Sequence, residues 1–392
     1  MTSTLGRPLR ILMISPQYHP IVGGYERAAE RLSAALAARG HHVTVISERR
    51  DTGWPQSEVR EGVAIRRLWC IYRPRLHMLT ALVSFALFLM FRGRRFDIWH
   101  AHQYGMHAGV AVALGFLMRR PVVLKLTSSG GQGLAQALSA TRFSRLLAAL
   151  HLHVDAVVAL TRETEREALA FGISPARIHV LGNGVDIERF RPRDENERQT
   201  IKRHLGLNAE HLVIFVGRLS PEKNVEGLLQ AWAQAHPLMG SGWTLLIIGD
   251  GPERRRLEDI VIRENLDGSV LLLGAKDSIN EWMGVAEIYV LTSDREGLSN
   301  TLLEAMACGL PVAATRVSGV SELVEAPGAG LTVEVGNMHD FSVALATLGG
   351  DGLLRANLGA KGRDVIHGRY SIEAVATRHE LLYQNLLSCK SA

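Results

Sequence analysis

Two glutamates eight positions apart, Glu296 and Glu304, flank a short polar stretch that is suited to holding an anion. The residues between them include four that are small or typical of helix caps: Gly297, Ser299, Asn300 and Thr301. They predict a helix start, where the first N–H groups carry a partial positive charge. Carboxylates on either side can accept hydrogen bonds from the hydroxyls of a sugar or ribose next to a phosphate. The stretch therefore indicates a sugar-nucleotide site.

A purely structural interpretation of the same residues stays open. Thr301 and Glu304 fit a capping box, in which Glu304 would accept only a backbone N–H. Glu296 would then be a solvated loop acid. The rest of the chain has to decide between the two interpretations.

A second candidate cluster follows the strand expected over 212–216. Gly217 permits close backbone approach, and Arg218 and Lys223 lie where that strand ends. Two cations beside a helix start suit a diphosphate. Surface cations without a ligand are the alternative. Their place at the same sheet edge as Glu296 favours the ligand role.

Glycines end two further strands of this half. The turn at 249–252 does not match Gly-x-Gly-x-x-Gly, which weighs against a nicotinamide cofactor. Backbone groups at Gly274 are placed to read the edge of a base. We expect no cofactor, and a nucleotide-diphosphate sugar as co-substrate.

The elements around these residues alternate between strands and helices, which predicts an α/β protein with doubly wound parallel sheets. A turn at 183–186 and a polar segment at 191–200 mark a boundary. We expect domains over 1–186 and 187–370, and a helix over 371–392 that packs back toward the first domain. Two such sheets facing across a cleft would bind ligands at their strand ends.

Composition narrows the function classes. Apolar residues make up 47% and charged residues 21%, which is typical of a globular chain. The net charge is +5, but the cations are scattered without interleaved aromatics, so no nucleic acid is expected as a partner. Three distant cysteines, Cys70, Cys308 and Cys389, weigh against disulfides and zinc, and no signal peptide is recognised. We expect a cytoplasmic protein.

An apolar run over 78–91 needs its own interpretation. At roughly 1.5 Å per residue it is too short to cross a hydrocarbon core of about 30 Å. A buried helix and a helix lying on a membrane both remain open. The run is flanked by arginines that attract anionic headgroups: Arg73, Arg75, Arg92, Arg94 and Arg95. An anionic membrane surface, at the inner face, is thus a further candidate partner.

Several segments together resemble a known family. FVGRLSPEKN, IIGDGPE, LLLGAKD and EGLSNTLLEAMACGLPVAAT resemble the donor-binding half of the family-four retaining glycosyltransferases (glycosyl transferases group 1). GGYERAAERLSAALAARGHHVTV and DIWHAHQYG resemble their acceptor half, and LGNGVD resembles the junction. The resemblance covers nearly the whole chain. It implies the GT-B architecture, in which two Rossmann-like domains face each other across a cleft.

The resemblance also implies roles for individual residues. Arg218 and Lys223 would bind the diphosphate, Glu296 the donor sugar and Glu304 the ribose hydroxyls; the first three are the expected catalytic residues. The other expected substrate-binding residues are Gly23, Gly24, His102, Thr127, Ser128, Gly217, Gly274, Leu298, Ser299, Asn300 and Thr301. Gly24 would approach the phosphates from the opposite domain.

The sequence departs from the family at one position. The family often carries a histidine after the strand that ends here at Leu126, where this chain has Thr127 and Ser128. Either hydroxyl could substitute by hydrogen bonding, or His102 could do part of the work. His100 and His102 could equally be packed structural imidazoles.

The expected reaction follows from the resemblance and from the cations. No Asp-x-Asp and no metal-spaced His/Asp cluster is seen, so Arg218 and Lys223 would meet the charge of the leaving nucleotide. The resemblance implies transfer with retention, by front-face attack of an acceptor hydroxyl on a UDP- or GDP-sugar. Glycan, lipid-linked and natural-product acceptors stay open. A non-hydrolysing nucleotide-sugar epimerase and a catalytically idle binding module are the alternatives.

Overall fold

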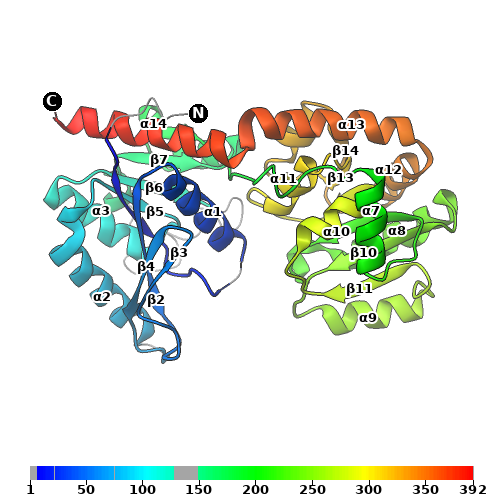
Figure 1. The fold of residues 1–392 in the computed structure, drawn as a ribbon, viewed down its shortest axis with the longest axis horizontal. Helices are drawn as coiled ribbons and strands as arrows, with labels where there is room; N and C mark the ends of the chain where they lie inside the picture. The colour runs from blue at the N-terminus through cyan, green and yellow to red at the C-terminus, as the bar shows by residue number, and fades with distance from the viewer. Residues whose placement is uncertain (1–6, 22, 75, 128–148, 392) are drawn as a thin grey trace. The chain divides into compact units, whose positions relative to one another are not determined.

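The computed structural model describes residues 7–21, 23–74, 76–127 and 149–391 (Figure 1). Ser128 and Arg75, both considered above, lie outside these ranges. Contacts divide the chain into two units. Unit 1 comprises Met1–Gly184 with Ile372–Ala392, and unit 2 comprises Val185–Ser371. The first junction thus lies two residues before the expected boundary after residue 186, and the C-terminal segment groups with unit 1.

Unit 1 is built on an eight-stranded sheet in the order β3-β4-β2-β1-β5-β6-β7-β8. All neighbouring strands are parallel except β3 and β4. The bounds are β1 Arg10–Ile14, β2 His42–Arg49, β3 Ser57–Arg60, β4 Val63–Trp69, β5 Ile98–Ala101, β6 Val122–Leu126, β7 Ala156–Ala159 and β8 Ile178–Val180. The central strands are buried and largely apolar because helices cover both of their faces, although β5 carries the buried His100 and β6 the buried Lys125.

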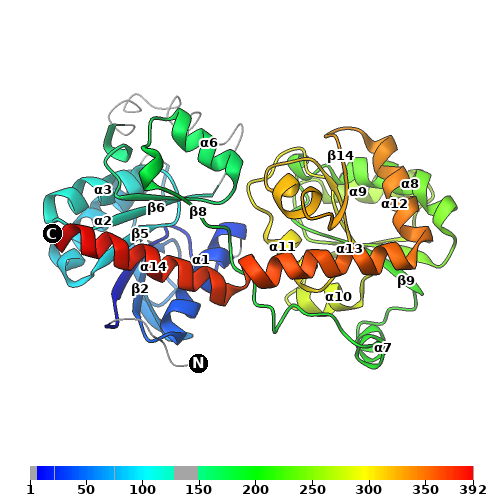
Figure 2. The ribbon, with the colours of Figure 1, turned by 90° about the horizontal axis from the view of Figure 1, so that it is seen from above.

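The helices of unit 1 include the last helix of the chain. Their bounds are α1 Gly24–Ala38, α2 His77–Arg92, η1 Gly93–Arg95, α3 Met106–Met118, α6 Arg162–Ala170, η3 Pro175–Arg177 and α14 Ile372–Ser391. Helix α14 lies beside α1 (Figures 1 and 2). Arg39 Nε, just after α1, donates to Glu380 Oε1 at 2.6 Å, and His41 Nε2 lies 2.9 Å from the same oxygen. These bonds and a shared apolar core hold α14 on unit 1.

Helix α2 forms over the apolar run, but it is not a buried helix. Its buried side chains are Ala81, Ser84, Phe85 and Leu89. Two of them, Phe85 and Leu89, belong to the apolar core beneath α2. Most of the remaining apolar side chains are exposed, so the buried-helix interpretation is wrong for the outer face. No helix in the described part of the chain has both the length and the apolar character to cross a membrane.

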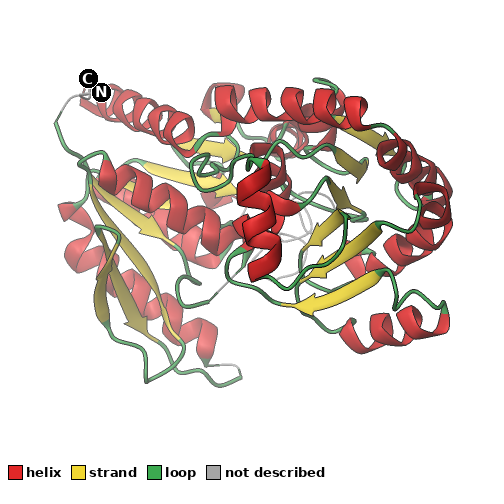
Figure 3. Cartoon of the chain, turned by 45° about the vertical axis from the view of Figure 1, so that its right-hand side comes forward, coloured by secondary structure: helices red, strands yellow, loops and turns green. Residues whose placement is uncertain are grey.

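Unit 2 has a parallel six-stranded sheet in the order β11-β10-β9-β12-β13-β14. Figure 3 draws the strands of both units in yellow and the helices in red. The bounds are β9 His211–Val216, β10 Trp243–Ile248, β11 Val270–Gly274, β12 Ile288–Leu291, β13 Val312–Thr315 and β14 Gly330–Val333. Starting from β9, the chain adds β10 and β11 on one side of this strand, and then adds β12, β13 and β14 on the other side. This is the doubly wound Rossmann order, and its switch point lies between β9 and β12.

Helices cover the sheet of unit 2, and its core lies between them and the strands. Their bounds are α7 Glu195–His204, η4 Pro221–Lys223, α8 Val225–Met239, α9 Arg254–Arg263, α10 Ile279–Val285, α11 Asn300–Ala307, η5 Ser321–Glu325, α12 Met338–Gly350, α13 Gly352–Val365 and η6 Ile366–Tyr370.

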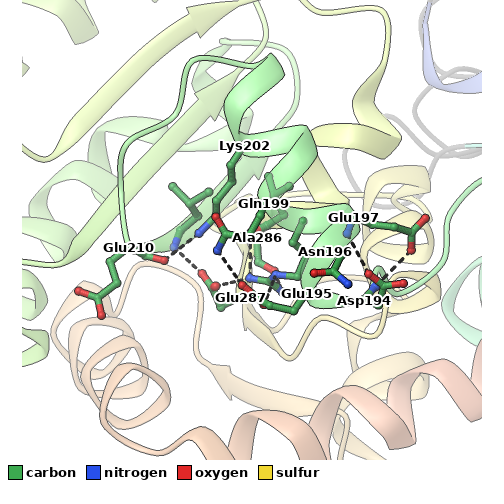
Figure 4. A network of polar contacts seen from close by, with 12 residues as sticks. Asp194, Glu195, Asn196, Glu197, Gln199, Lys202, Glu210, Ala286 and Glu287 are labelled. Carbon is green, nitrogen blue, oxygen red and sulfur yellow. Dashed lines mark hydrogen bonds and ion pairs between the residues drawn. The ribbon is translucent and has the colours of Figure 1, made fainter.

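Polar contacts fix α7 to the amino-terminal end of this sheet (Figure 4). Asp194 and Glu197 form a capping box that begins the helix. Lys202 Nζ donates to the carbonyl of Glu210 at 2.8 Å, just before β9. Arg198 forms an ion pair with Glu287, just before β12. The polar segment after the junction is therefore an anchored part of unit 2.

Candidate functional site

The switch point of unit 2 brings together two of the predicted side chains. Lys223 ends the short turn η4 after β9, and Glu296 lies in the loop after β12. The ammonium and the carboxylate form an ion pair. Their side chains are 20% and 15% exposed, so the pair is reachable from solvent but partly shielded. Adjacent carboxyl ends of parallel strands are where ligands of this architecture bind.

Three further contacts join the same two loops. The N–H of Asp294 donates to the carbonyl of Glu222 at 2.9 Å. Asn224 Nδ2 donates to Asp294 Oδ1 at 3.1 Å, and Thr292 Oγ1 donates to the carbonyl of Lys223 at 3.0 Å. Sequence reasoning missed Asn224, Asp294 and Thr292, because nothing in their local spacing shows that they meet. Together these contacts hold Lys223 and Glu296 in a fixed relation.

Asn224 has a second role in the loop after β9. Its φ of 48° lies in the left-handed region that asparagine tolerates better than most residues. Its side-chain oxygen accepts from the N–H of Gly227 at 3.0 Å and so caps α8. The chain can therefore turn sharply after Lys223 and begin a helix at once.

Arg218 projects from the loop after β9. Its side chain is exposed and, among the described residues, makes no hydrogen bond or ion pair. The adjacent backbone is packed tightly, because a Cβ at Gly249 would lie 1.7 Å from the carbonyl oxygen of Gly217. The N–H of Leu219 also donates to the carbonyl of Asp250 at 2.9 Å. The loops after β9 and β10 thus support a guanidinium that is available to an anion.

Helix α11 begins at the same edge of the sheet. Ser299 is its N-cap and accepts from the N–H of Leu302 at 3.3 Å. The alternative capping box that began at Thr301 is therefore wrong: the Thr301 hydroxyl instead lies 2.8 Å from the Tyr289 hydroxyl. Glu304 sits in the second turn of the helix and is 1% exposed. Its carboxyl is a buried acid close to a helix N-terminus.

The loop before α11 and the end of β11 complete the set in unit 2. Leu298 is buried, and Gly297 and Asn300 are partly exposed. Gly274 ends β11 with a φ of +71°, and its carbonyl accepts from the N–H of Gly249 at 2.9 Å. The structure therefore gathers the unit 2 candidates along the carboxyl edge of one sheet.

The candidates in unit 1 lie at the carboxyl ends of its own strands. Gly23 is the N-cap of α1 and Gly24 is its first residue, in the connection that follows β1. Thr127 directly follows β6 and is partly exposed. Ser128 lies outside the described residues.

His102 belongs to a buried cluster of titratable groups. It is 1% exposed, its Nε2 lies 3.2 Å from Met13 Sδ, and its ring stacks on His100 at 4.5 Å. Burial, reinforced by the nearby Lys125 ammonium, holds the pKa of His102 well below its usual range. This geometry favours the packed-imidazole interpretation of His102.

The cluster extends to the C-terminal helix. His100 Nδ1 lies 2.6 Å from the Tyr383 hydroxyl of α14, and the ring of His379 lies 5.7 Å from that of His100. Burial lowers the pKa of Lys125, also in the cluster, to about 8. The sequence suggested packed imidazoles at His100 and His102 but not their link to α14, because His100 and Tyr383 are 283 positions apart.

Metal ligands are not grouped in the described ranges. Within residues 7–21, 23–74, 76–127 and 149–391, no three His, Cys, Asp or Glu side chains are arranged to hold a metal ion.

The comparisons with protein families agree on both units. The model described as Glycosyl transferases group 1 matches residues 197–365. The model described as Glycosyl transferase 4-like domain matches residues 23–184.

Relatives match over most of the chain. A GDP-mannose-dependent alpha-mannosyltransferase of Mycolicibacterium smegmatis is 30% identical over 342 residues, which cover 83% of this chain and 85% of the relative. An N-acetyl-alpha-D-glucosaminyl L-malate synthase of Bacillus anthracis is 25% identical over 382 residues, covering 96% and 97%.

Solved structures share the fold. The Anabaena protein Alr3699/HepE in complex with UDP superposes with a TM-score of 0.79 at 20% identity, covering 96% of this chain and 100% of that chain. A sucrose-phosphate synthase from Thermosynechococcus elongatus gives 0.79 at 24% identity, covering 97% and 99%. At these identities the likeness concerns the fold alone. With two parallel-sheet α/β units, the family matches and these relatives, the chain belongs to the family-four glycosyltransferases (glycosyl transferases group 1) of GT-B architecture, which use nucleotide sugars.

Proposed function

We propose that this chain is a retaining, metal-independent hexosyltransferase that moves a sugar from a UDP- or GDP-sugar to an acceptor hydroxyl. The observation that carries the proposal is the Lys223–Glu296 pair at the switch point of unit 2. It places a cation and an acid side by side where a parallel sheet binds nucleotides.

The donor binds along the carboxyl edge of unit 2. Arg218 and Lys223 hold the diphosphate, assisted by N–H groups at the start of α11 around Leu298–Asn300. Glu296 accepts hydrogen bonds from the donor sugar, and Glu304 accepts them from the ribose. The backbone at Gly274 reads the base. Support comes from the placement of all these groups on one sheet edge.

Transfer then breaks one bond and forms another on the same face of the sugar. The anomeric carbon loses its bond to the diphosphate oxygen and gains one to the acceptor oxygen. The departing phosphate oxygen takes the proton of the acceptor hydroxyl. Arg218 and Lys223 stabilise the charge that develops on the nucleoside diphosphate, and losing one such donor typically costs about 10²–10³ in rate.

Unit 1 supplies the acceptor site in this proposal. Gly24, the first residue of α1, and Thr127, directly after β6, are its candidate residues. We leave His102 out of the donor contacts because its ring is enclosed by Met13 and His100. The GDP-mannose dependence of a 30% identical relative supports a GDP-sugar donor, and UDP-sugars are tested beside it because HepE, which shares the fold, binds UDP.

Product analysis tests the proposal. The full chain is incubated with UDP- and GDP-sugars and a panel of hydroxyl acceptors, and the product's anomeric configuration is read by NMR. We expect a product that keeps the configuration of the donor sugar. An inverted product would overturn retention.

Two control reactions address the rival functions. Without acceptor, an epimerised sugar nucleotide would favour the epimerase. Tight donor binding with no nucleoside diphosphate released by any acceptor would favour the idle binding module.

A further inference from the structure

Helix α2 presents an apolar face that nothing in the described chain covers. We define the α2 face by nine side chains that are 37–79% exposed: Ile71, Tyr72, Leu76, Met78, Leu79, Val83, Leu87, Met90 and Phe91. Five of them recur every three or four residues and so form one stripe along the helix: Leu76, Leu79, Val83, Leu87 and Met90. Scattered exposed hydrophobics are ordinary, but a continuous stripe marks an interaction surface.

The surface does not end with α2. At the C-terminal end of the neighbouring helix α3, Phe116 and Leu117 are each 74% exposed. Arg120 Nη2 donates to the carbonyl of Arg94 at 2.8 Å, which ties the end of α3 to the end of α2. Both helices cover the same side of the unit 1 sheet (Figure 1). Phe116 and Leu117 therefore add exposed apolar surface near the C-terminal end of the α2 face.

The exposed charged side chains described within residues 71–95 are all arginines, and Glu48, the acid that contacts His77 at the start of α2, is only 4% exposed. Arg73 lies before the helix, and Arg92, Arg94 and Arg95 lie at its end; all four are exposed. No aspartate or glutamate occurs between Glu61 and Asp97 in the sequence. Cations at both ends of an apolar stripe, with no acid among them, match an anionic lipid surface.

The helix is firmly held from beneath. Phe85 and Leu89 are fully buried on its inner side. At its start, His77 Nε2 lies 3.1 Å from Glu48 Oε2, and Thr80 Oγ1 accepts from the N–H of Ile71 at 3.0 Å. The exposed face is thus a property of the folded unit rather than of a detached helix.

We propose that the α2 face docks unit 1 onto an anionic lipid bilayer, with α2 lying in the plane of the headgroups. The apolar stripe enters the boundary between headgroups and acyl chains, while the arginines at both ends contact lipid phosphates. The helix lies on the bilayer and does not cross it. This docking requires neither donor nor acceptor, so it is decided independently of the catalytic proposal.

Vesicle co-sedimentation of the full chain tests the docking. Vesicles of phosphatidylcholine alone are compared with vesicles that contain about a third phosphatidylglycerol, the anionic fraction that the arginines should sense. We expect binding to the anionic vesicles at least tenfold stronger. Raising the salt to about 1 M, where the Debye length falls to about 3 Å, should remove most of that difference.

Matched variants locate the surface. Leu79→Glu and Phe91→Glu, 61% and 79% exposed, should each weaken binding at least tenfold. Each of Arg92→Gln and Arg95→Gln should weaken it about fivefold, the effect of one cation near an anionic surface. The control is Leu353→Glu in unit 2, where the side chain is 86% exposed and binding should not change.

Three outcomes would overturn the docking. Equal binding to neutral and anionic vesicles would remove the charge argument. If Leu79→Glu and Phe91→Glu bind vesicles as tightly as the wild type and melt at the same temperature, the bilayer does not contact the α2 face. Light scattering that shows a dimer, converted to monomer by Leu79→Glu, without vesicle binding, would assign the face to a second copy of the chain.

Discussion

Lys223 and Glu296 are 73 positions apart in the chain, yet their side chains form an ion pair across the switch point of unit 2. The pair joins the loop after β9 to the loop after β12. Carboxylates and phosphates are both charged acceptors for an ammonium, so a bound diphosphate could share Lys223 with Glu296.

A double variant separates the structural role of this pair from its chemical role. Lys223→Met and Glu296→Gln should each lower the free energy of unfolding by about 1 kcal/mol or less, since both side chains reach solvent. Each should lower kcat by about 10²–10³. In the double variant, stability measured by urea unfolding should recover while turnover stays low. Recovery of turnover together with stability would mean that the pair only holds the loops.

Arg218 should act on the diphosphate alone. Arg218→Ala should lower kcat/KM by about 10²–10³ while leaving the free energy of unfolding within about 0.5 kcal/mol, because the side chain is exposed. Calorimetric affinity for UDP or GDP should fall, and affinity for the matching nucleoside should not. Arg263→Ala, at an exposed position of α9, is the matched control. Equal losses for nucleoside and diphosphate would reject the assignment.

Glu304 should report on the ribose hydroxyls. Glu304→Gln keeps the shape of a side chain that is 1% exposed, so thermal melting should change little. A hydrogen bond to a charged group contributes about 1.5–3 kcal/mol, so affinity for the ribonucleoside diphosphate should fall about 10–100-fold. A 2′,3′-dideoxy nucleoside diphosphate should bind the wild type and the variant equally. A loss of the same size for both ligands would contradict ribose binding.

Chelation tests whether protein cations meet the charge of the leaving group. With Arg218 and Lys223 at the diphosphate, excess EDTA should leave the initial rate of transfer unchanged. Added Mg²⁺ should not accelerate it. A rate that collapses in EDTA and returns with Mg²⁺ would show that a divalent ion takes part.

The buried imidazoles predict that unit 1 weakens in acid. Burial, with Lys125 nearby, lowers the pKa of His379 to about 3, and the pKa values of His100 and His102 are also lowered. Below pH 6.5 these three histidines become protonated in the unfolded chain but stay neutral in the folded chain. Stability is therefore lost progressively as the pH falls from about 6.5 toward 3, by up to about 1.4 kcal/mol per pH unit for each histidine.

Hydrogen exchange can localise that effect. Protection of α14 and β5, corrected for intrinsic exchange rates, should fall between pH 6.5 and 5. His379→Gln should reduce the slope of this protection against pH by the share of one histidine, up to about 1.4 kcal/mol per pH unit. This change in slope is separate from any effect of the substitution on stability at neutral pH. A slope identical to that of the wild type would show that His379 does not carry it.

Local patterns in the sequence predicted a good part of the fold. Buried apolar runs alternating with helices indicated parallel doubly wound sheets, and the motif segments indicated the family. The polar residues after β9 and β12 were recognised as a candidate site because strand ends share an edge. The helix start near Glu304 was also expected, and its cap is Ser299, one of the four residues that predicted it.

Other features depend on which distant segments pack together. Sequence alone could not decide between a donor contact and a packed imidazole for His102, because Met13 and His100 enclose its ring only in the folded unit.

The same limit applies to α2, whose apolar run was compatible with burial or exposure. The folded structure shows that Phe85 and Leu89 form the buried side of the helix. Thus the sequence by itself determined the fold class, the family and the residue types at the sheet edge, because periodicity, capping and strand ends are local. Only the tertiary structure decided that Lys223 meets Glu296 and that α2 keeps an open face, because strand order and burial are set by long-range packing of the whole chain.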